Sequence, residues 1–321
     1  MNLVRRLACL ALLLSPTLFA APAAQAGPFE FHSDFWLNLH HFLYEQASSH
    51  AKRTSDLAGD EKIAWDKALA FYRQTMVTHD LLFDPHMQAI DTELAEDETL
   101  PKLVLNGTDG ALWDTLNSVA PIYRSHWWPA HDQANSNYIA AALPLIQHYG
   151  PTFIKQLTAA YETSWPKDPI RVDVSEYANW AGAYTYTYGW SRIHEIVSSS
   201  DNANQGNAAL EVLFHEATHG IVPSKSGRLA DQISLASKTH GVQTPKDLSH
   251  IFIFYTAGEL ARRDLPTGYL PYAEKKRLYQ DEWARWHSSI AVYWMQHLDG
   301  TLSLNDAVNK VVEETGKKLG K

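Results

Sequence analysis

Two histidines and a glutamate at helical spacing are the residues in this sequence best suited to chemistry. In the segment NAALEVLFHEATHGIV (207–222), His215 and His219 are four residues apart, and Glu216 directly follows the first. Because an α-helix turns once in 3.6 residues, both imidazoles lie on one face and can bind one metal ion. Zinc takes about four ligands, and a catalytic site keeps one position for water. Glu216, about 100° around the helix, is placed to take a proton from that water.

This interpretation requires the rest of the helix to be buried. Leu210, Leu213 and Ala217 lie roughly opposite the histidines, so the histidine face must look into a cleft. The alternative is a surface helix whose histidines are solvated or capping. The apolar residues around the motif favour the metal site.

A third ligand has to come from another segment. A metzincin would have a histidine six residues after His219, but Lys225 stands there. The apolar helix predicted from FIFYTAGELARR carries Glu259, and a carboxylate buried in such a helix needs a cation or several hydrogen bonds. Gly258, just before it, allows a close approach by another segment. We therefore predict that Glu259 is the third zinc ligand.

Other ligands and another role for Glu259 stay open. His250 is the next candidate for the third ligand, followed by Asp231 or Glu211. Alternatively, Glu259 forms an ordinary ion pair with an arginine three or four residues later on a half-exposed face.

The combination of HEATH with GELARR on a later helix resembles the gluzincin metallopeptidases, the thermolysin-like group. The resemblance covers residues 215–263 and implies a zincin-like core in which His215, His219 and Glu259 bind one zinc ion and Glu216 is the general base. Thermolysin-type enzymes have an Asp four residues after the ligand Glu, whereas this chain has Arg263. The group that orients a zinc-bound histidine must then come from elsewhere. The segment FHSDFWLNLHHFLY is also similar to the beginning of some exported bacterial proteins with this motif.

Peptide hydrolysis also needs a donor for the oxyanion that develops on the carbonyl. Tyr255 is the first candidate because it precedes Glu259 by four residues and shares its helix face, although it could equally be a core tyrosine. His194, in the region before the motif helix, is the second candidate. The resemblance implies that the segment AYTYTYGWSRIHEI lines the cleft and pairs with an extended substrate.

The elements that position these residues are mainly helical. Apolar spacing predicts helices within 35–47, 60–76, 132–165, 250–263, 274–298 and 303–319, the third of them interrupted near Pro144 and Gly150. β-Branched and aromatic residues predict strands near 170–174, 181–189 and 192–199. We therefore predict a mainly α protein with a small β-sheet (α+β), divided into an N-terminal helical region (27–165) and a metallopeptidase region (166–321).

The first residues predict export to the periplasm or the medium. Arg5 and Arg6 precede an apolar run and the small residues APAAQA, which is typical of a secretory leader over residues 1–26. Cys9, the single cysteine, lies in this leader, so the mature chain would have no disulfide. The formal charge is −9, without a basic stripe, which argues against nucleic acid as a partner. No later segment is long and apolar enough to span a membrane.

Taken together, these features predict an exported zinc metallopeptidase with one Zn²⁺ ion and a peptide or protein substrate. A non-catalytic, zinc-stabilised protein that binds peptides or glycans through its 11 tryptophans and 15 tyrosines is the alternative. A third possibility is a purely structural helical protein without metal.

Two further segments contain histidines. A second metal site at His32, His40 and His41 is disfavoured, because adjacent helical residues do not converge on one ion; one of the pair is expected to face the core and the other solvent. The run RSHWWPAH (124–131) is expected to be a buried wedge between helices rather than a binding surface.

Overall fold

The computed structural model describes residues 24–48, 56–104, 109–186 and 192–318. The strands are β1 (Ala24–Ala26), β2 (Phe29–His32), β3 (Ile170–Ser175), β4 (Ala183–Tyr186) and β5 (His194–Ser198). The helices before β3 are α1 (Phe35–Ser48), α2 (Gly59–Thr75), α3 (Pro85–Glu96), α4 (Gly110–His126) and α5 (Trp128–Tyr161). After β5 come the short 3-10 helix η1 (Asn202–Asn204), α6 (Ala208–Ile221), α7 (Arg228–His240), α8 (Leu248–Asp264), α9 (Tyr272–Lys275), α10 (Asp281–Leu298) and α11 (Leu304–Lys318).

The prediction of a mainly helical protein with a small sheet is confirmed. The sheet has the strand order β1-β2-β3-β5-β4, in which β2, β3 and β5 run parallel and the edge strands β1 and β4 are antiparallel to their neighbours. The three strands expected from the sequence are present as β3, β4 and β5. The strands β1 and β2 were not predicted, because three or four residues are too few for a recognisable alternation of side chains.

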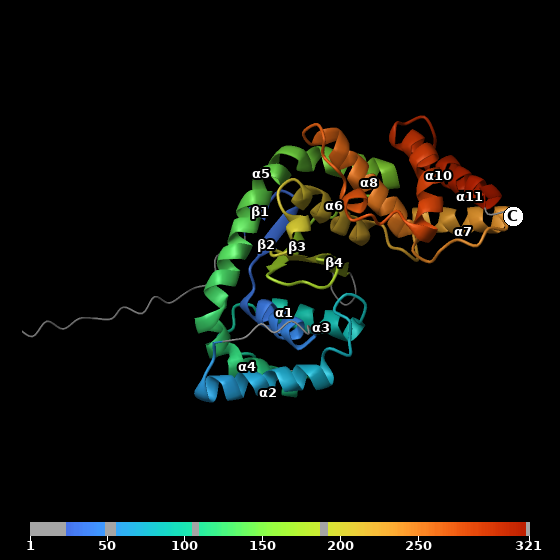
Figure 1. Cartoon of the computed structure of the whole chain (residues 1–321). Coiled ribbons are helices and arrows are strands. Elements are labelled where there is room, and N and C mark those ends of the chain that lie inside the picture. The colour runs from blue at the N-terminus through green and yellow to red at the C-terminus, as the bar shows by residue number, and fades with distance from the viewer. Residues whose placement is uncertain (1–23, 49–55, 105–108, 187–191, 319–321) are drawn as a thin grey trace, which may run out of the picture.

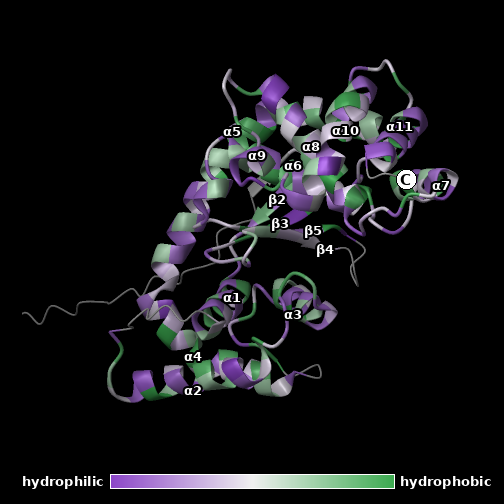
Figure 2. Ribbon diagram, turned by 45° about the vertical axis from the view of Figure 1, so that its right-hand side comes forward, coloured by the Kyte–Doolittle hydropathy of each residue, from purple (hydrophilic) through white to green (hydrophobic). Residues whose placement is uncertain are grey.

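Helices cover both faces of the sheet (Figure 1). One apolar cluster contains Phe29, Val172 and Val197 of the sheet with helices α5 to α8, α10 and α11. The other contains Tyr184, Tyr186 and Ile196 of the sheet with helices α1 to α4. Neighbouring residues of β5 thus point into different cores, as the alternation of side chains along a strand requires. The turned view in Figure 2 shows the same order, with the sheet between the two sets of helices.

Helix α5 connects the two helical layers along one side of the molecule (Figure 1). Its predicted interruption is wrong, because the helix continues for 34 residues through Pro144 and Pro151. An interior proline costs about 3 kcal/mol, but Gly150 lies close to Phe214 of α6, and Ile146 and Phe153 are buried beside it. The burial of α5 against both helical layers therefore outweighs the free-energy cost of its interior prolines.

The remaining organisational predictions concern the leader and the domain boundary. The predicted leader lies outside the described residues apart from Ala24–Ala26, which form β1. The sheet crosses the predicted boundary at 165, because β2 pairs with β3. Among the described residues, no helix has the length and apolar character that crossing a bilayer would require.

Candidate metal site and cleft

Helix α6 holds the motif between a core and a cleft. Leu210, Leu213 and Ala217 are fully buried on one side of it, as predicted from their spacing. On the other side, His215, Glu216 and His219 line a cleft of about 1070 Å³. The cleft is bounded by β4, by the loop before α3, by the first turn of α8 and by the segment around α9.

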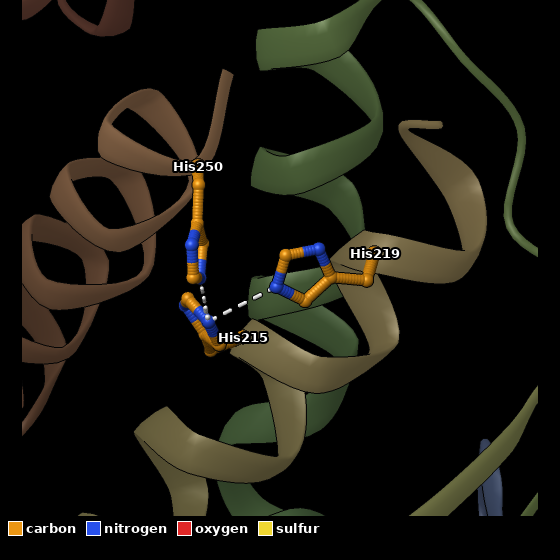
Figure 3. A group of neighbouring side chains, drawn as sticks. All are labelled: His215, His219 and His250. Atoms are coloured by element: carbon orange, nitrogen blue, oxygen red, sulfur yellow. Dashed lines mark hydrogen bonds between the residues drawn. The ribbon is translucent and has the colours of Figure 1, made fainter. Parts of the chain in front are cut away.

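A third histidine completes the cluster in the cleft. His250, in the first turn of α8, points toward the pair on α6 (Figure 3). The Nε2 atom of His215 lies 3.2 Å from Nε2 of His219 and 3.2 Å from Nε2 of His250. Zinc–nitrogen bonds of about 2.0–2.1 Å in a tetrahedron place two ligand nitrogens roughly 3.3 Å apart. The three imidazoles therefore fit one zinc ion and leave a fourth position toward the cleft.

The protonation state of the cluster also suits a metal. Burial lowers the pKa of all three histidines, to about 3 for His219 and about 4 for His250, and the neighbouring imidazoles lower that of His215 further. At neutral pH the rings are therefore uncharged and have lone pairs to donate. A ring nitrogen carries either one hydrogen or one lone pair, so contacts among three Nε2 atoms cannot all be good hydrogen bonds. A cation between the three atoms would satisfy every one of them.

Packing, rather than a carboxylate, orients the rings. The Phe254 ring lies 3.9 Å from the His215 ring and 4.6 Å from the His250 ring, measured between centroids. The Nδ1 atom of His215 is buried and has no hydrogen-bond partner among the described residues. Metal-bound histidines usually donate this second N–H to an oxygen. Here Phe254, one helical turn after His250, holds the ring in place instead.

Glu216 is fixed by the edge strand of the sheet. The Thr185 hydroxyl of β4 lies 3.0 Å from the Glu216 carboxylate and 3.0 Å from its backbone carbonyl oxygen. Burial raises the pKa of Glu216 to about 7, and the hydrogen bond from Thr185 opposes this rise. A carboxylate with such a pKa can exchange a proton near neutral pH, which suits a general base.

Glu259 does not join the histidines, so the predicted position of the third ligand-type side chain is corrected: it is His250 that lies beside His215 and His219. Its carboxylate accepts a hydrogen bond of 3.1 Å from Arg262, three residues later on α8. Since Glu259 is nine residues beyond His250, it lies roughly 13 Å farther along the helix axis. Gly258 does permit a close approach, but Pro271 and the Glu211 carboxylate occupy the space.

The two weaker ligand candidates are also excluded from the cluster. The Glu211 carboxylate accepts hydrogen bonds from the Tyr269 hydroxyl at 2.6 Å and from the Tyr272 backbone N–H. Asp231 is exposed on α7 and does not contribute to the cluster of ligand atoms.

Neither predicted oxyanion donor reaches the cleft lining. Tyr255 is buried on the side of α8 that faces α10, where its ring lies 5.7 Å from the His287 ring. The ring nitrogens of His194 contact the Asp173 carboxylate at 2.5 Å and the Tyr186 hydroxyl at 2.6 Å. Both residues were placed correctly on their elements, but their side chains point away from the three histidines.

Asp173 belongs to a second cluster of ligand-type atoms, formed with Asp34 and Glu98 behind the cleft. The Arg171 guanidinium donates to Asp173 at 2.6 Å and to Glu98 at 2.5 Å. Asp34 accepts the backbone N–H of Leu37 at 2.7 Å at the beginning of α1. Because the chain supplies the cation of this cluster, we assign it a structural role.

The N-terminal histidines are structural as well. His40 contacts the Tyr72 hydroxyl at 2.7 Å, and His41 contacts the Asp91 carboxylate at 3.0 Å. The expectation that one of the pair faces solvent is wrong, because both are fully buried.

The other histidine-containing segments are accounted for in the same way. His32 contacts Glu98 at 2.9 Å. In the segment 124–131, Trp127 packs on Trp65 with 4.5 Å between ring centroids and Trp128 is buried, as expected for a wedge, whereas the three residues before them are exposed.

One rim of the cleft is aromatic. Phe83 and Trp180 are both 69% exposed, and their ring centroids are 6.3 Å apart. They lie beside β4, whose outer edge is unpaired within the described sheet. An extended chain could therefore pair with β4 while its side chains contact this rim.

Comparison with protein-family models, with curated proteins and with solved structures gives no match for this chain. The resemblance to gluzincins thus remains a prediction from the motif, and function has to be argued from the site itself.

Proposed function

We propose that this protein is an exported, zinc-dependent metallopeptidase that hydrolyses peptide bonds in the cleft between β4 and helices α6 and α8. The observation that carries the proposal is the convergence of three neutral imidazoles next to a buried glutamate on the wall of this cleft. His215, His219 and His250 would hold the zinc ion. This ligand set replaces the two histidines and one glutamate that the resemblance to gluzincins implied.

The residues around the cluster have distinct tasks in this reaction. Zinc, when bound, would polarise the peptide carbonyl and lower the pKa of water at the open position. Glu216 takes a proton from the attacking water and gives it to the leaving amine. Thr185 holds the Glu216 carboxylate on the side of the sheet, so that it faces the cleft. The unpaired edge of β4 provides backbone groups that can align an extended peptide.

Substitution of the base tests this function most simply. Glu216→Gln keeps the shape and removes the proton acceptor, so we expect full zinc content and a fall in kcat of at least about 100-fold, the usual contribution of a general base. Glu259→Gln is the matched control, because Glu259 lies outside the cleft, and it should retain activity. Hydrolysis of a peptide library at the wild-type rate by Glu216→Gln would overturn the mechanism.

The exposed pair Phe83 and Trp180 supports a second candidate function. The same site could stabilise a non-catalytic protein that binds peptides or glycans on this aromatic rim. Stoichiometric zinc without cleavage of any library peptide, together with ligand binding that Trp180→Ala abolishes, would favour binding over hydrolysis.

A further inference from the structure

Lysines are placed around the cleft in an otherwise acidic chain. The cleft lining includes Lys225, six residues after His219, and Lys246, four residues before His250. Lys276, just after α9, is the third. The whole chain has 36 acidic and 27 basic residues. An anion would therefore be repelled by the molecule as a whole, and these lysines are the groups of the cleft that can bind one.

The same cleft is also lined by three carboxylates, Glu211, Glu216 and Asp247, and each of them is held by a hydrogen bond within the protein. Glu211 accepts hydrogen bonds from the segment around α9, and Glu216 accepts one from Thr185. Asp247 accepts a hydrogen bond of 2.7 Å from the Trp283 indole. These carboxylates are thus held by the protein, whereas the side chains of Lys225 and Lys246 are exposed to solvent.

Lys225 and Lys246 also differ from Lys276 in their partners. Neither makes an ion pair with any residue in the described ranges, whereas Lys276 lies 3.9 Å from Asp201. Lys276 also lies over the Tyr272 ring, at 5.6 Å from its centroid. Two lysines that flank the histidine cluster are therefore free to bind a ligand, and the third is already engaged.

The lysines also differ in the elements that they lie next to. The Tyr272 hydroxyl donates to the carbonyl of Ala181, so Lys276 belongs to the beginning of β4 and to the aromatic rim. Gly220, near the end of α6, lies directly against Ile193, just before β5. Lys225 lines the cleft four residues after the end of α6. Lys225 and Lys246 thus belong to the segments next to the histidines, whereas Lys276 belongs to the segment next to the aromatic rim.

We infer that the substrate is a peptide with a carboxylate close to the scissile bond, and that Lys225 and Lys246 bind this carboxylate. This inference rests on the proposed function and specifies its substrate class. The carboxylate comes either from an acidic side chain or from the free C-terminus of a short peptide. Both sources offer two oxygens to an ammonium group and gain from the positive field of a zinc ion on three neutral ligands.

Matched peptides can test the inference and identify the source. One set places Glu or Gln at each position around a cleavable bond, and a second set ends in a free carboxylate or an amide. We expect kcat/KM of the zinc-loaded wild type to be about tenfold higher for the preferred carboxylate than for its neutral counterpart, the size expected from two partly exposed ion pairs. The preference should weaken at high salt.

The variants assign the preference to the two lysines. Lys225→Met/Lys246→Met should lower the preference to within about twofold, because kcat/KM falls for the charged peptides more than for their neutral counterparts. Lys276→Met is the matched control and should keep the preference. Equal rates for charged and neutral peptides in the wild type, or an unchanged preference in the double variant, would overturn the inference.

A binding measurement separates this inference from the proposed function. Calorimetry with zinc-loaded Glu216→Gln protein reports the affinity for the same peptides without any need for turnover. A wild type that cleaves no peptide contradicts the proposed function, whereas equal affinity for charged and neutral peptides contradicts the carboxylate preference. A carboxylate preference in binding that disappears in the double variant supports the assignment of the carboxylate site to Lys225 and Lys246.

Discussion

Two clusters of potential metal ligands lie on the two sides of this sheet, and they differ in whether the chain itself supplies a cation. In the acidic cluster, Arg171 contributes the positive charge for Glu98 and Asp173, and among the described residues one oxygen of Asp34 has no hydrogen-bond partner. In the histidine cluster, the Nε2 atoms of His219 and His250 each lie 3.2 Å from Nε2 of His215, beside a cleft and without a cation from the chain. Proximity of ligand atoms is therefore a weak criterion for a metal site. The stronger criterion is whether the chain itself already provides the cation.

The largest effect expected from this comparison is on the acidic cluster. Arg171→Met removes its cation and leaves buried carboxylates facing each other, which should lower the free energy of unfolding by about 3–5 kcal/mol. The half-exposed Arg192, paired with Glu30, is the matched control, and Arg192→Met should cost less than about 1 kcal/mol. Urea denaturation measures both values.

Repeating the denaturation with added zinc tests whether the acidic cluster binds metal. Excess zinc should stabilise the wild type and Arg171→Met by the same amount, because both bind it at the histidine cluster, so the difference in stability between them should remain. Specific recovery of that variant with zinc would mean that the acidic cluster is itself a metal site and would contradict our assignment.

A smaller effect is expected at Glu195, a buried carboxyl for which the chain supplies no cation. Glu195 on β5 is fully buried, and neither of its oxygens has a hydrogen-bond partner among the described residues. Burial, followed by the charge of Glu216, raises the pKa of Glu195 well above its usual range. The folded protein therefore keeps the proton after the unfolded chain has lost it.

The sign of the resulting pH dependence follows directly. Below the pKa of the unfolded chain, about 4.3, Glu195 is protonated in both states and its contribution to stability is fully present. As the pH rises above this value toward the pKa of the folded protein, the free energy of unfolding falls by about 1 kcal/mol per pH unit. Glu195→Gln should remove this loss, so the variant gains stability over the wild type between pH 5 and pH 8. A constant difference across that range would show that Glu195 is ionised in the folded protein.

The fold was predictable where its signal is local. The motif helix, its buried face at Leu210 and Leu213, and the three strands from 170 to 198 follow from periodicity and side-chain shape. The strand β2 was not predictable, because four residues form a strand here through pairing with β3, more than 130 residues away. The continuous helix α5 likewise depends on tertiary packing that overrides its prolines.

The candidate site was predictable only where its residues lie close together in the sequence. His215, Glu216 and His219 share one helix, so their spacing alone determines their arrangement. The third ligand depends on how α8 crosses α6, which a single sequence does not encode locally. The apolar surroundings and the family resemblance favour Glu259, whereas the crossing brings the beginning of α8, with His250, to the motif. Thr185 and Phe254 carry no local signal of their roles.

The central claim is that His250, and not Glu259, completes the metal site, and zinc content measures this directly. Wild-type protein, His250→Ala and Glu259→Ala would be loaded with zinc, dialysed against a weak chelator and measured by elemental analysis. We predict about one zinc ion per chain in the wild type and in Glu259→Ala, and a loss of zinc in His250→Ala. Full zinc content in His250→Ala together with its loss in Glu259→Ala would contradict the arrangement described for this cleft.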